Sequence, residues 1–202
     1  MNGAAGAPFD VRIAWAPVAP GSDTSARGAR REVAWALLRH LLAEAGAPDA
    51  VLTNPCPVCG GPHGPVRVGG APWLASVSYA AGWSIAAICP AAAGAFGVDA
   101  EAVADTVRDA AGWAGVGAPG ALPWARIEAA HKADGRGLRL DPRTTTLDPP
   151  DGDGLWRARL AATADGRGGL FVGWEPGGTP PGVIVSVAVS AAAAAPVRRA
   201  TL

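Results

Sequence analysis

Two acidic side chains that could hold a metal ion lie in the segment Gly97-Val98-Asp99-Ala100-Glu101. In a strand, side chains alternate between faces, so Asp99 and Glu101 point the same way. Adjacent carboxylates repel unless a proton or a cation lies between them, and oxygen ligands suit a hard ion such as Mg²⁺. The alternative is an exposed strand end with two solvated acids. The pair by itself leaves both interpretations open.

A second charged pair, Glu128 and Lys132, stands four residues apart in the segment 124–133. Pro123 precedes this segment and Asp134-Gly135 follows it, which predicts a helix with both side chains on one face. An ordinary surface ion pair would have the same spacing.

A loop rich in proline and glycine carries Cys56, Cys59 and His63, whose spacing is compatible with Zn²⁺. A structural zinc site would need a fourth ligand, for which Cys89 or His40 is a candidate. The alternative, which we favour at the level of sequence, is a plain turn with reduced cysteines.

Regular elements must position these groups. A helix is predicted over 22–45, where an apolar stripe repeats at helical spacing and an arginine-bearing face lies opposite. Alternating or apolar runs predict strands over 9–16, 73–78, 84–89, 95–100, 155–162, 169–175 and 183–188. Antiparallel strands with few helices predict an α+β fold. We place the boundary between an N-terminal half, 1–95, and a C-terminal half, 96–202.

The amino-acid composition of the chain excludes some classes of binding partner. Lys plus Arg equals Asp plus Glu at 17 each, so no overall field attracts nucleic acid or an anionic membrane. The apolar stretches are too short to span a bilayer, no secretory leader is recognisable, and three cysteines do not form an even disulfide framework. A cytoplasmic monomer that contacts neither membrane nor nucleic acid is expected.

In these segments the chain resembles the phosphopantetheinyl transferase superfamily of the Sfp type. That family is recognised by a Gly-x-Asp-x-Glu segment followed by a Trp-x-x-x-Glu-Ala-x-x-Lys helix. Residues 97–101 and 124–132 match both without a substitution at the defining positions. The similarity extends to the arginine-bearing helix, the serine-containing segment before Asp99 and the C-terminal strands.

The resemblance implies two pseudo-twofold-related α+β halves, each a small, mainly antiparallel sheet packed on a helix, with the active site at their interface. It implies coenzyme A in that cleft and Mg²⁺ bound by Asp99, Glu101 and Glu128. Glu128, or water held by the metal, would remove the proton of a serine on an acyl or peptidyl carrier protein. Lys132 would stabilise the departing adenosine bisphosphate.

The resemblance also implies contacts between the protein and coenzyme A. The residues placed to make them are Arg31, Arg39, His63, Arg67, Ser78 and Tyr79. Arginine suits phosphate oxygens, although an arginine on a helix face is more often solvated surface.

Three departures from the family pattern accompany the match. Tyr79 stands where many relatives have a histidine, so it cannot supply a positive charge near neutral pH. No Lys or Arg stands between Gly64 and Pro65. The segment 102–123, which in relatives helps to dock the carrier, is short; within it we expect Val103 to be core.

Two functions of different classes follow. The first is Mg²⁺-dependent transfer of the 4′-phosphopantetheine moiety from coenzyme A to a carrier serine. The alternative is a diverged, non-catalytic member that binds coenzyme A or a related nucleotide. Retention of Asp99, Glu101, Glu128 and Lys132 favours the enzyme.

Overall fold

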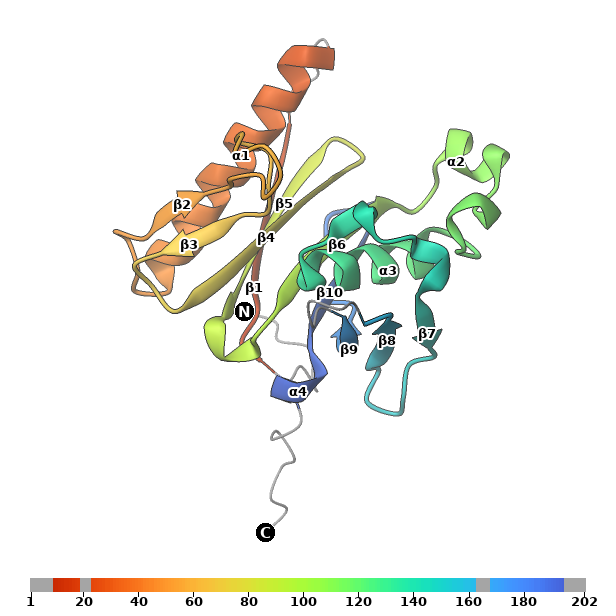
Figure 1. The fold of residues 1–202 in the computed structure, drawn as a ribbon. Helices are drawn as coiled ribbons and strands as arrows, with labels where there is room; N and C mark the ends of the chain where they lie inside the picture. The colour runs from red at the N-terminus through yellow and green to blue at the C-terminus, as the bar shows by residue number, and fades with distance from the viewer. Residues whose placement is uncertain (1–8, 19–22, 163–167, 195–202) are drawn as a thin grey trace.

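Two antiparallel sheets, each covered by a helix, and one small hairpin make up the fold (Figure 1). The computed structural model describes residues 9–18, 23–162 and 168–194. The chain is a mixed α+β protein, as the order of apolar runs predicts. None of the helices within these ranges is long and apolar enough to cross a membrane.

The first sheet is formed by the N-terminal part of the chain. Its strands, in spatial order, are β1 (Arg12–Pro17), β5 (Trp83–Pro90) and β4 (Trp73–Ala80). Helix α1 (Asp23–Glu44) packs on one face, where Leu38 and Leu42 are buried against Ala86 and Ile88. Strands β2 (Val51–Thr53) and β3 (Arg67–Gly69) pair beside it and enclose the Cys/His loop.

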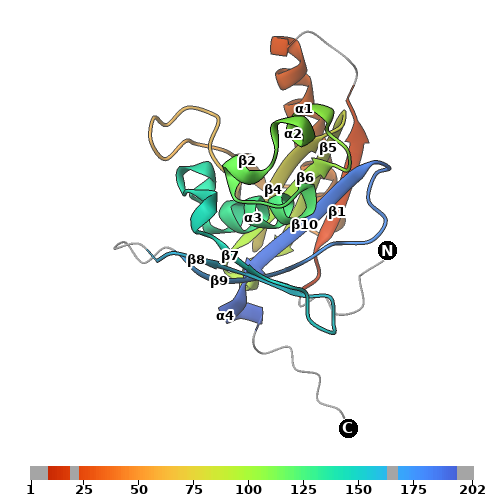
Figure 2. The ribbon, with the colours of Figure 1, turned by 90° about the vertical axis from the view of Figure 1, so that its right-hand side faces the viewer.

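The second sheet follows in sequence. Its order is β6 (Phe96–Ala102), β10 (Val183–Ser190), β9 (Gly169–Trp174), β8 (Trp156–Leu160) and β7 (Thr146–Asp148). Helix α3 (Ala121–Asp134) lies across β6 and β10 (Figure 2). The remaining elements are η1 (Ala91–Ala93), α2 (Thr106–Ala111), η2 (Ala114–Val116), η3 (Gly137–Arg139), η4 (Pro142–Thr144) and α4 (Ala191–Ala194).

Strands β4 and β6 lie side by side although they belong to different sheets. Two serine hydroxyls of β4 join them: Ser76 Oγ accepts a hydrogen bond from the Val98 amide at 3.0 Å, and Ser78 Oγ accepts one from the Ala100 amide at 3.2 Å. These side chains replace the backbone ladder that would otherwise satisfy buried amides. The seam between the sheets therefore places Ser78 next to Asp99.

The predicted elements compare well with the observed ones. All seven predicted strands and both long helices are present, with ends shifted by up to three residues. The short strands β2, β3 and β7 and helix α2 were not predicted, because three to six residues carry too little periodicity. Ser22, the predicted helix start, lies outside the described residues. Along the chain, the last strand of the first sheet ends at Pro90 and the first strand of the second sheet begins at Phe96. The division of the chain into two halves stays a prediction.

Candidate functional site

The structure brings together the three carboxylates that the sequence singles out. Asp99 and Glu101 project from β6 and Glu128 from α3, and one oxygen of each lies within 4.8 Å of the others. Asp99 is 1% exposed and Glu101 is 7% exposed, so the alternative of a solvated strand end is wrong. Three carboxylates this close, two of them buried and Glu128 half-buried, require compensating positive charge.

Gly97 explains why α3 lies so close to β6. A Cβ atom at this position would lie 2.2 Å from the carbonyl oxygen of Ala129 and 2.5 Å from the amide nitrogen of Ala133. Only glycine allows this approach, and the approach brings Glu128 and Lys132 over Asp99. The glycine of the motif is therefore a packing requirement of the site.

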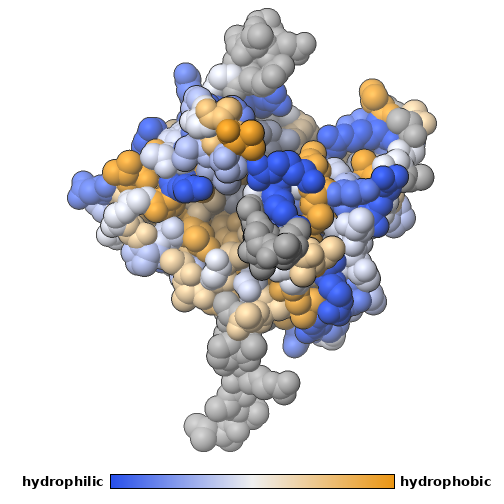
Figure 3. Space-filling model, in the orientation of Figure 1, coloured by the Kyte–Doolittle hydropathy of each residue, from blue (hydrophilic) through white to orange (hydrophobic). Residues whose placement is uncertain are grey.

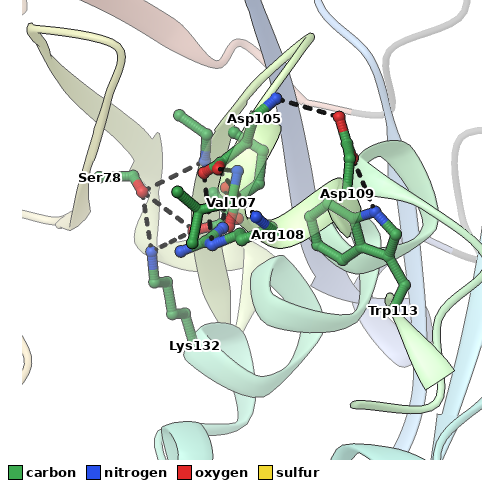
Figure 4. Close-up of polar contacts among 10 residues, drawn as sticks. Ser78, Asp105, Val107, Arg108, Asp109, Trp113 and Lys132 are labelled. Carbon is green, nitrogen blue, oxygen red and sulfur yellow. Dashed lines mark hydrogen bonds and ion pairs between the residues drawn. The ribbon is translucent and has the colours of Figure 1, made fainter. Parts of the chain in front are cut away.

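Asp99 is held by one of its two oxygens. Its Oδ1 accepts hydrogen bonds from Lys132 Nζ at 2.6 Å and from Ser78 Oγ at 2.9 Å. Figure 4 shows Lys132 reaching from α3 toward Ser78 on β4. The other oxygen, Oδ2, is buried and has no hydrogen-bond partner among the described residues. A buried acceptor without a partner is costly, and a cation at this point would satisfy it.

Ser78 was predicted to contact coenzyme A, but its hydroxyl is already in use. It donates to Asp99 and accepts from the Ala100 amide and from Lys132 Nζ at 3.0 Å. A hydroxyl has one donor and two lone pairs, so these bonds fill its capacity. In this structure Ser78 positions Asp99 and Lys132.

The electrostatics of the cluster follow from burial. Burial, followed by the negative charge of Asp99, raises the pKa of Glu128 to about 7. The same two causes raise the pKa of Glu101. For Lys132 burial disfavours the charge, but Asp99 and Glu128 outweigh it, so its pKa is raised. The carboxylates are thus short of positive charge, as expected for residues that bind a divalent cation.

Arg108, which sequence reasoning missed, supplies part of that charge. It lies on α2, forms an ion pair with Glu101, and lies 3.7 Å from a carboxylate oxygen of Asp105 (Figure 4). The Asp105 side chain caps α2 by accepting from two backbone amides, one of them that of Arg108. An arginine seven residues after Glu101 gives no periodic signal, because the turn between β6 and α2 brings the two together.

Two apolar side chains of the segment 102–123 are exposed. Val103 is 60% exposed and Val107 is 77% exposed. Our expectation that Val103 is core is therefore wrong: β6 ends at Ala102, and the chain turns outward before Val103 can pack.

A cleft of about 860 Å³ adjoins the cluster on the Lys132 side. It lies between the Cys/His loop, β3, β4 and the C-terminal end of α3. Its lining includes no acidic residue and five basic ones, His63, Arg67, Lys132, Arg136 and Arg139. In the space-filling view, hydrophilic residues gather near the middle of this face (Figure 3). The cleft is suited to an anionic ligand.

Two of the basic groups are held in place. Arg136 forms an ion pair with Asp134 and donates to the carbonyl of Ala161 at 3.1 Å. Arg139 donates to the carbonyls of Gly135 and Arg136. Sequence reasoning noted this stretch only as the end of the helix. Two arginines directly after a helix end were the available signal.

The structure separates the predicted ligand contacts into two groups. His63 and Arg67 line the cleft, whereas Arg31, Arg39 and Tyr79 do not. Arg31 donates to the carbonyl of Pro62 at 2.6 Å and to Asn54 Oδ1 at 2.9 Å. It is a structural link between α1 and the Cys/His loop.

Arg39 and Tyr79 are engaged elsewhere. Arg39 is exposed and lies over the ring of Trp35 at 5.8 Å. Tyr79 lies under the guanidinium of Arg30 at 5.7 Å, and burial raises the pKa of its phenol. It is therefore a neutral hydrogen-bonding group at neutral pH.

The second candidate metal cluster is also assembled, but without its predicted fourth member. Cys56, Cys59 and His63 each offer one ligand atom within 4.8 Å of the others. Cys89 is buried in the core that the two sheets share, and His40 lies 3.5 Å from Glu44 on α1. Neither joins the cluster, so both proposals for a fourth ligand are wrong.

Comparison of the chain with models of known protein families gives no match, and no curated protein matches it significantly. The family resemblance therefore remains a prediction from the two motifs.

Proposed function

We propose that this protein is a Mg²⁺-dependent phosphopantetheinyl transferase, which moves the 4′-phosphopantetheine moiety of coenzyme A onto a serine of an acyl or peptidyl carrier protein. One observation carries the proposal. Two buried carboxylates and one half-buried carboxylate form a cluster beside a basic cleft that Lys132 also lines, and Asp99 Oδ2 has no hydrogen-bond partner among the described residues. Both sequence motifs supply this cluster.

The proposal includes the arrangement of the halves. The N-terminal sheet with α1 and the C-terminal sheet with α3 would be related by a pseudo-twofold axis, with the active site between them. Supporting this, the seam of β4 and β6 runs beside both the carboxylate cluster and the cleft.

Coenzyme A would occupy the cleft. Its volume of about 860 Å³ falls in the range of pockets that hold cofactors of this size. Arg67, Arg136 and Arg139 would neutralise the phosphate groups of the nucleotide, and Lys132 would stand where cleft and cluster meet. This arrangement would put the pyrophosphate beside the carboxylates.

Asp99, Glu101 and Glu128 would hold the Mg²⁺ ion. The ion would neutralise charge on the pyrophosphate oxygens, so that the serine oxygen of the carrier can approach the phosphorus atom that these oxygens surround. Lys132 donates to Asp99 at 2.6 Å, and its side chain also lines the cleft.

Glu128 would take the proton of the carrier serine. In the metal-free protein its pKa is about 7, and a cation held beside it would lower that pKa and favour the ionised carboxylate, which is the form that accepts a proton. The serine oxygen would form a bond to the phosphorus that bears the pantetheine arm. The bond between that phosphorus and the bridging oxygen would break, releasing adenosine 3′,5′-bisphosphate, whose added negative charge Lys132 would stabilise.

The test is incubation of the protein with coenzyme A, Mg²⁺ and a panel of apo acyl and peptidyl carrier proteins, followed by intact mass measurement of each carrier. We expect one carrier class to gain one phosphopantetheine group. Glu128→Gln should abolish the gain, and Asp148→Asn, at an exposed acid on the edge strand β7, should not change it.

The alternative is a non-catalytic protein that binds coenzyme A. The pairing of Arg108 with Glu101 favours this second function, since one of the three carboxylates already has an ion-pair partner where the metal would bind. Measurable coenzyme A binding without a mass gain on any carrier would replace the transferase by this second function.

A further inference from the structure

The Cys/His loop between β2 and β3 holds a second set of ligand atoms that the transferase reaction does not use. Cys56, Cys59 and His63 offer one atom each within 4.8 Å of one another, and Cys59 Sγ lies 3.0 Å from His63 Nε2. Two sulfurs and an imidazole nitrogen form a ligand set that prefers Zn²⁺ to a hard ion such as Mg²⁺.

Backbone hydrogen bonds fix the loop in this shape. The Cys56 amide donates to the Gly61 carbonyl at 2.8 Å, and the Gly60 amide donates to the Cys56 carbonyl at 2.9 Å. Gly60 has a φ of 72°, a left-handed conformation that favours glycine. A Cβ on Gly64 would lie 2.1 Å from the Pro55 carbonyl oxygen, so this position requires glycine as well.

The loop is also fastened to the rest of the protein. Arg31 on α1 donates to Pro62 and Asn54, and Asn54 Nδ2 donates to the same Pro62 carbonyl at 2.9 Å. A loop held at both its base and its far side loses less conformational entropy when a ligand binds. This gives Arg31 a role that does not involve coenzyme A.

We infer that Cys56, Cys59 and His63 bind one Zn²⁺ ion with three protein ligands and one solvent ligand. No fourth Cys, His, Asp or Glu joins the cluster in the part of the chain that the structure describes. All three ligands line the basic cleft, so the solvent-held position is on its side. Three protein ligands plus water is a regular zinc arrangement.

Charge makes this site compatible with an anionic ligand in the cleft. Two thiolates balance the charge of Zn²⁺ and a neutral imidazole adds none. Zinc binding therefore leaves the positive charge of Arg67, Arg136 and Arg139 in place.

The experiment measures metal content directly. The full chain is expressed with zinc in the medium, purified in chelator-free reducing buffer, and analysed by inductively coupled plasma mass spectrometry. We expect one zinc per chain in the natural protein, in Cys89→Ala and in Asp99→Asn. The double variant Cys56→Ser/Cys59→Ser should hold less than a tenth of that amount while its far-ultraviolet circular dichroism is unchanged.

Cobalt provides an independent readout. Co²⁺ added to metal-free protein should give sulfur-to-cobalt charge-transfer absorption and the visible bands of tetrahedral cobalt, and His63→Asn should weaken and shift them. The inference is overturned if the natural protein retains no zinc after incubation with an equimolar amount. It is equally overturned if the double cysteine variant retains as much zinc as Cys89→Ala, or if the reduced natural protein gives no cobalt–sulfur absorption.

Discussion

Asp99 is the residue around which the candidate site is organised. One of its oxygens is fully engaged by Lys132 and Ser78, and the other is buried with no partner among the described residues. Such an asymmetric carboxylate combines a fixed position with a free metal ligand. The contacts of Oδ1 and the metal binding expected at Oδ2 can be tested separately.

Removal of the ammonium group should destabilise the protein. In Lys132→Met, Asp99 stays 1% exposed and loses its ion-pair partner, which costs about 3 kcal/mol of unfolding free energy. Urea denaturation in a chelating buffer measures this loss. A divalent cation should restore part of it by binding the same carboxylate, and an unchanged midpoint in both buffers would contradict the assigned pairing.

Arg108 should compete with a divalent cation for Glu101. In Arg108→Ala the ion pair with Glu101 is lost, so a cation no longer has to break it. We expect affinity for Mn²⁺, used as a spectroscopic substitute for Mg²⁺, to rise about 10-fold, the equivalent of one charge-assisted hydrogen bond. Titration followed by electron paramagnetic resonance measures it. Arg159→Ala, at a residue of β8 that is exposed, is the control, and equal affinities in the two variants would exclude competition.

At the scale of elements, the approach of α3 to β6 decides the geometry of the carboxylates. Gly97→Ala places a Cβ within 2.5 Å of the helix backbone, so helix and strand must separate. We expect a loss of about 1–3 kcal/mol in unfolding free energy together with weaker divalent metal binding. Gly152→Ala, where an added Cβ meets nothing within 4 Å, is the matched control.

The seam between β4 and β6 is a second element-scale feature. Ser76→Ala removes the acceptor of the Val98 amide, leaving a buried N–H unpaired, which costs about 1–3 kcal/mol. Chemical denaturation gives the magnitude. Ser76→Thr keeps the hydroxyl and should lose less, and the reverse order would argue that packing, not this hydrogen bond, joins the strands.

At the scale of the whole molecule, Cys89 lies in the core that the two sheets share, so the titration of its thiol affects the stability of the folded chain. Burial raises the pKa of this thiol to about 12 from its usual 9.0. Folding favours the protonated form, so its contribution to stability is complete below pH 9 and is lost as pH rises toward 12. The unfolding free energy of Cys89→Ala should therefore fall less steeply than that of the natural protein between pH 9 and 11.

The sequence by itself determined the α+β class, the principal strands and helices, and the acidic and basic residues of the two motifs. These depend on local periodicity and on residue type, which the chain carries without reference to its fold. The alternation of β6 also placed Asp99 and Glu101 on one face.

Only the tertiary structure decided the rest. Three features depend on contacts between different segments of the chain, and no local pattern indicates which segments meet. They are the strand order β6-β10-β9-β8-β7, the hydroxyls that join β4 to β6, and the pairing of Arg108 with Glu101. The same holds for the cleft, which Arg136 and Arg139 line and Arg31 and Arg39 do not. The direction of a long side chain depends on what packs beside it, and packing is a property of the folded chain.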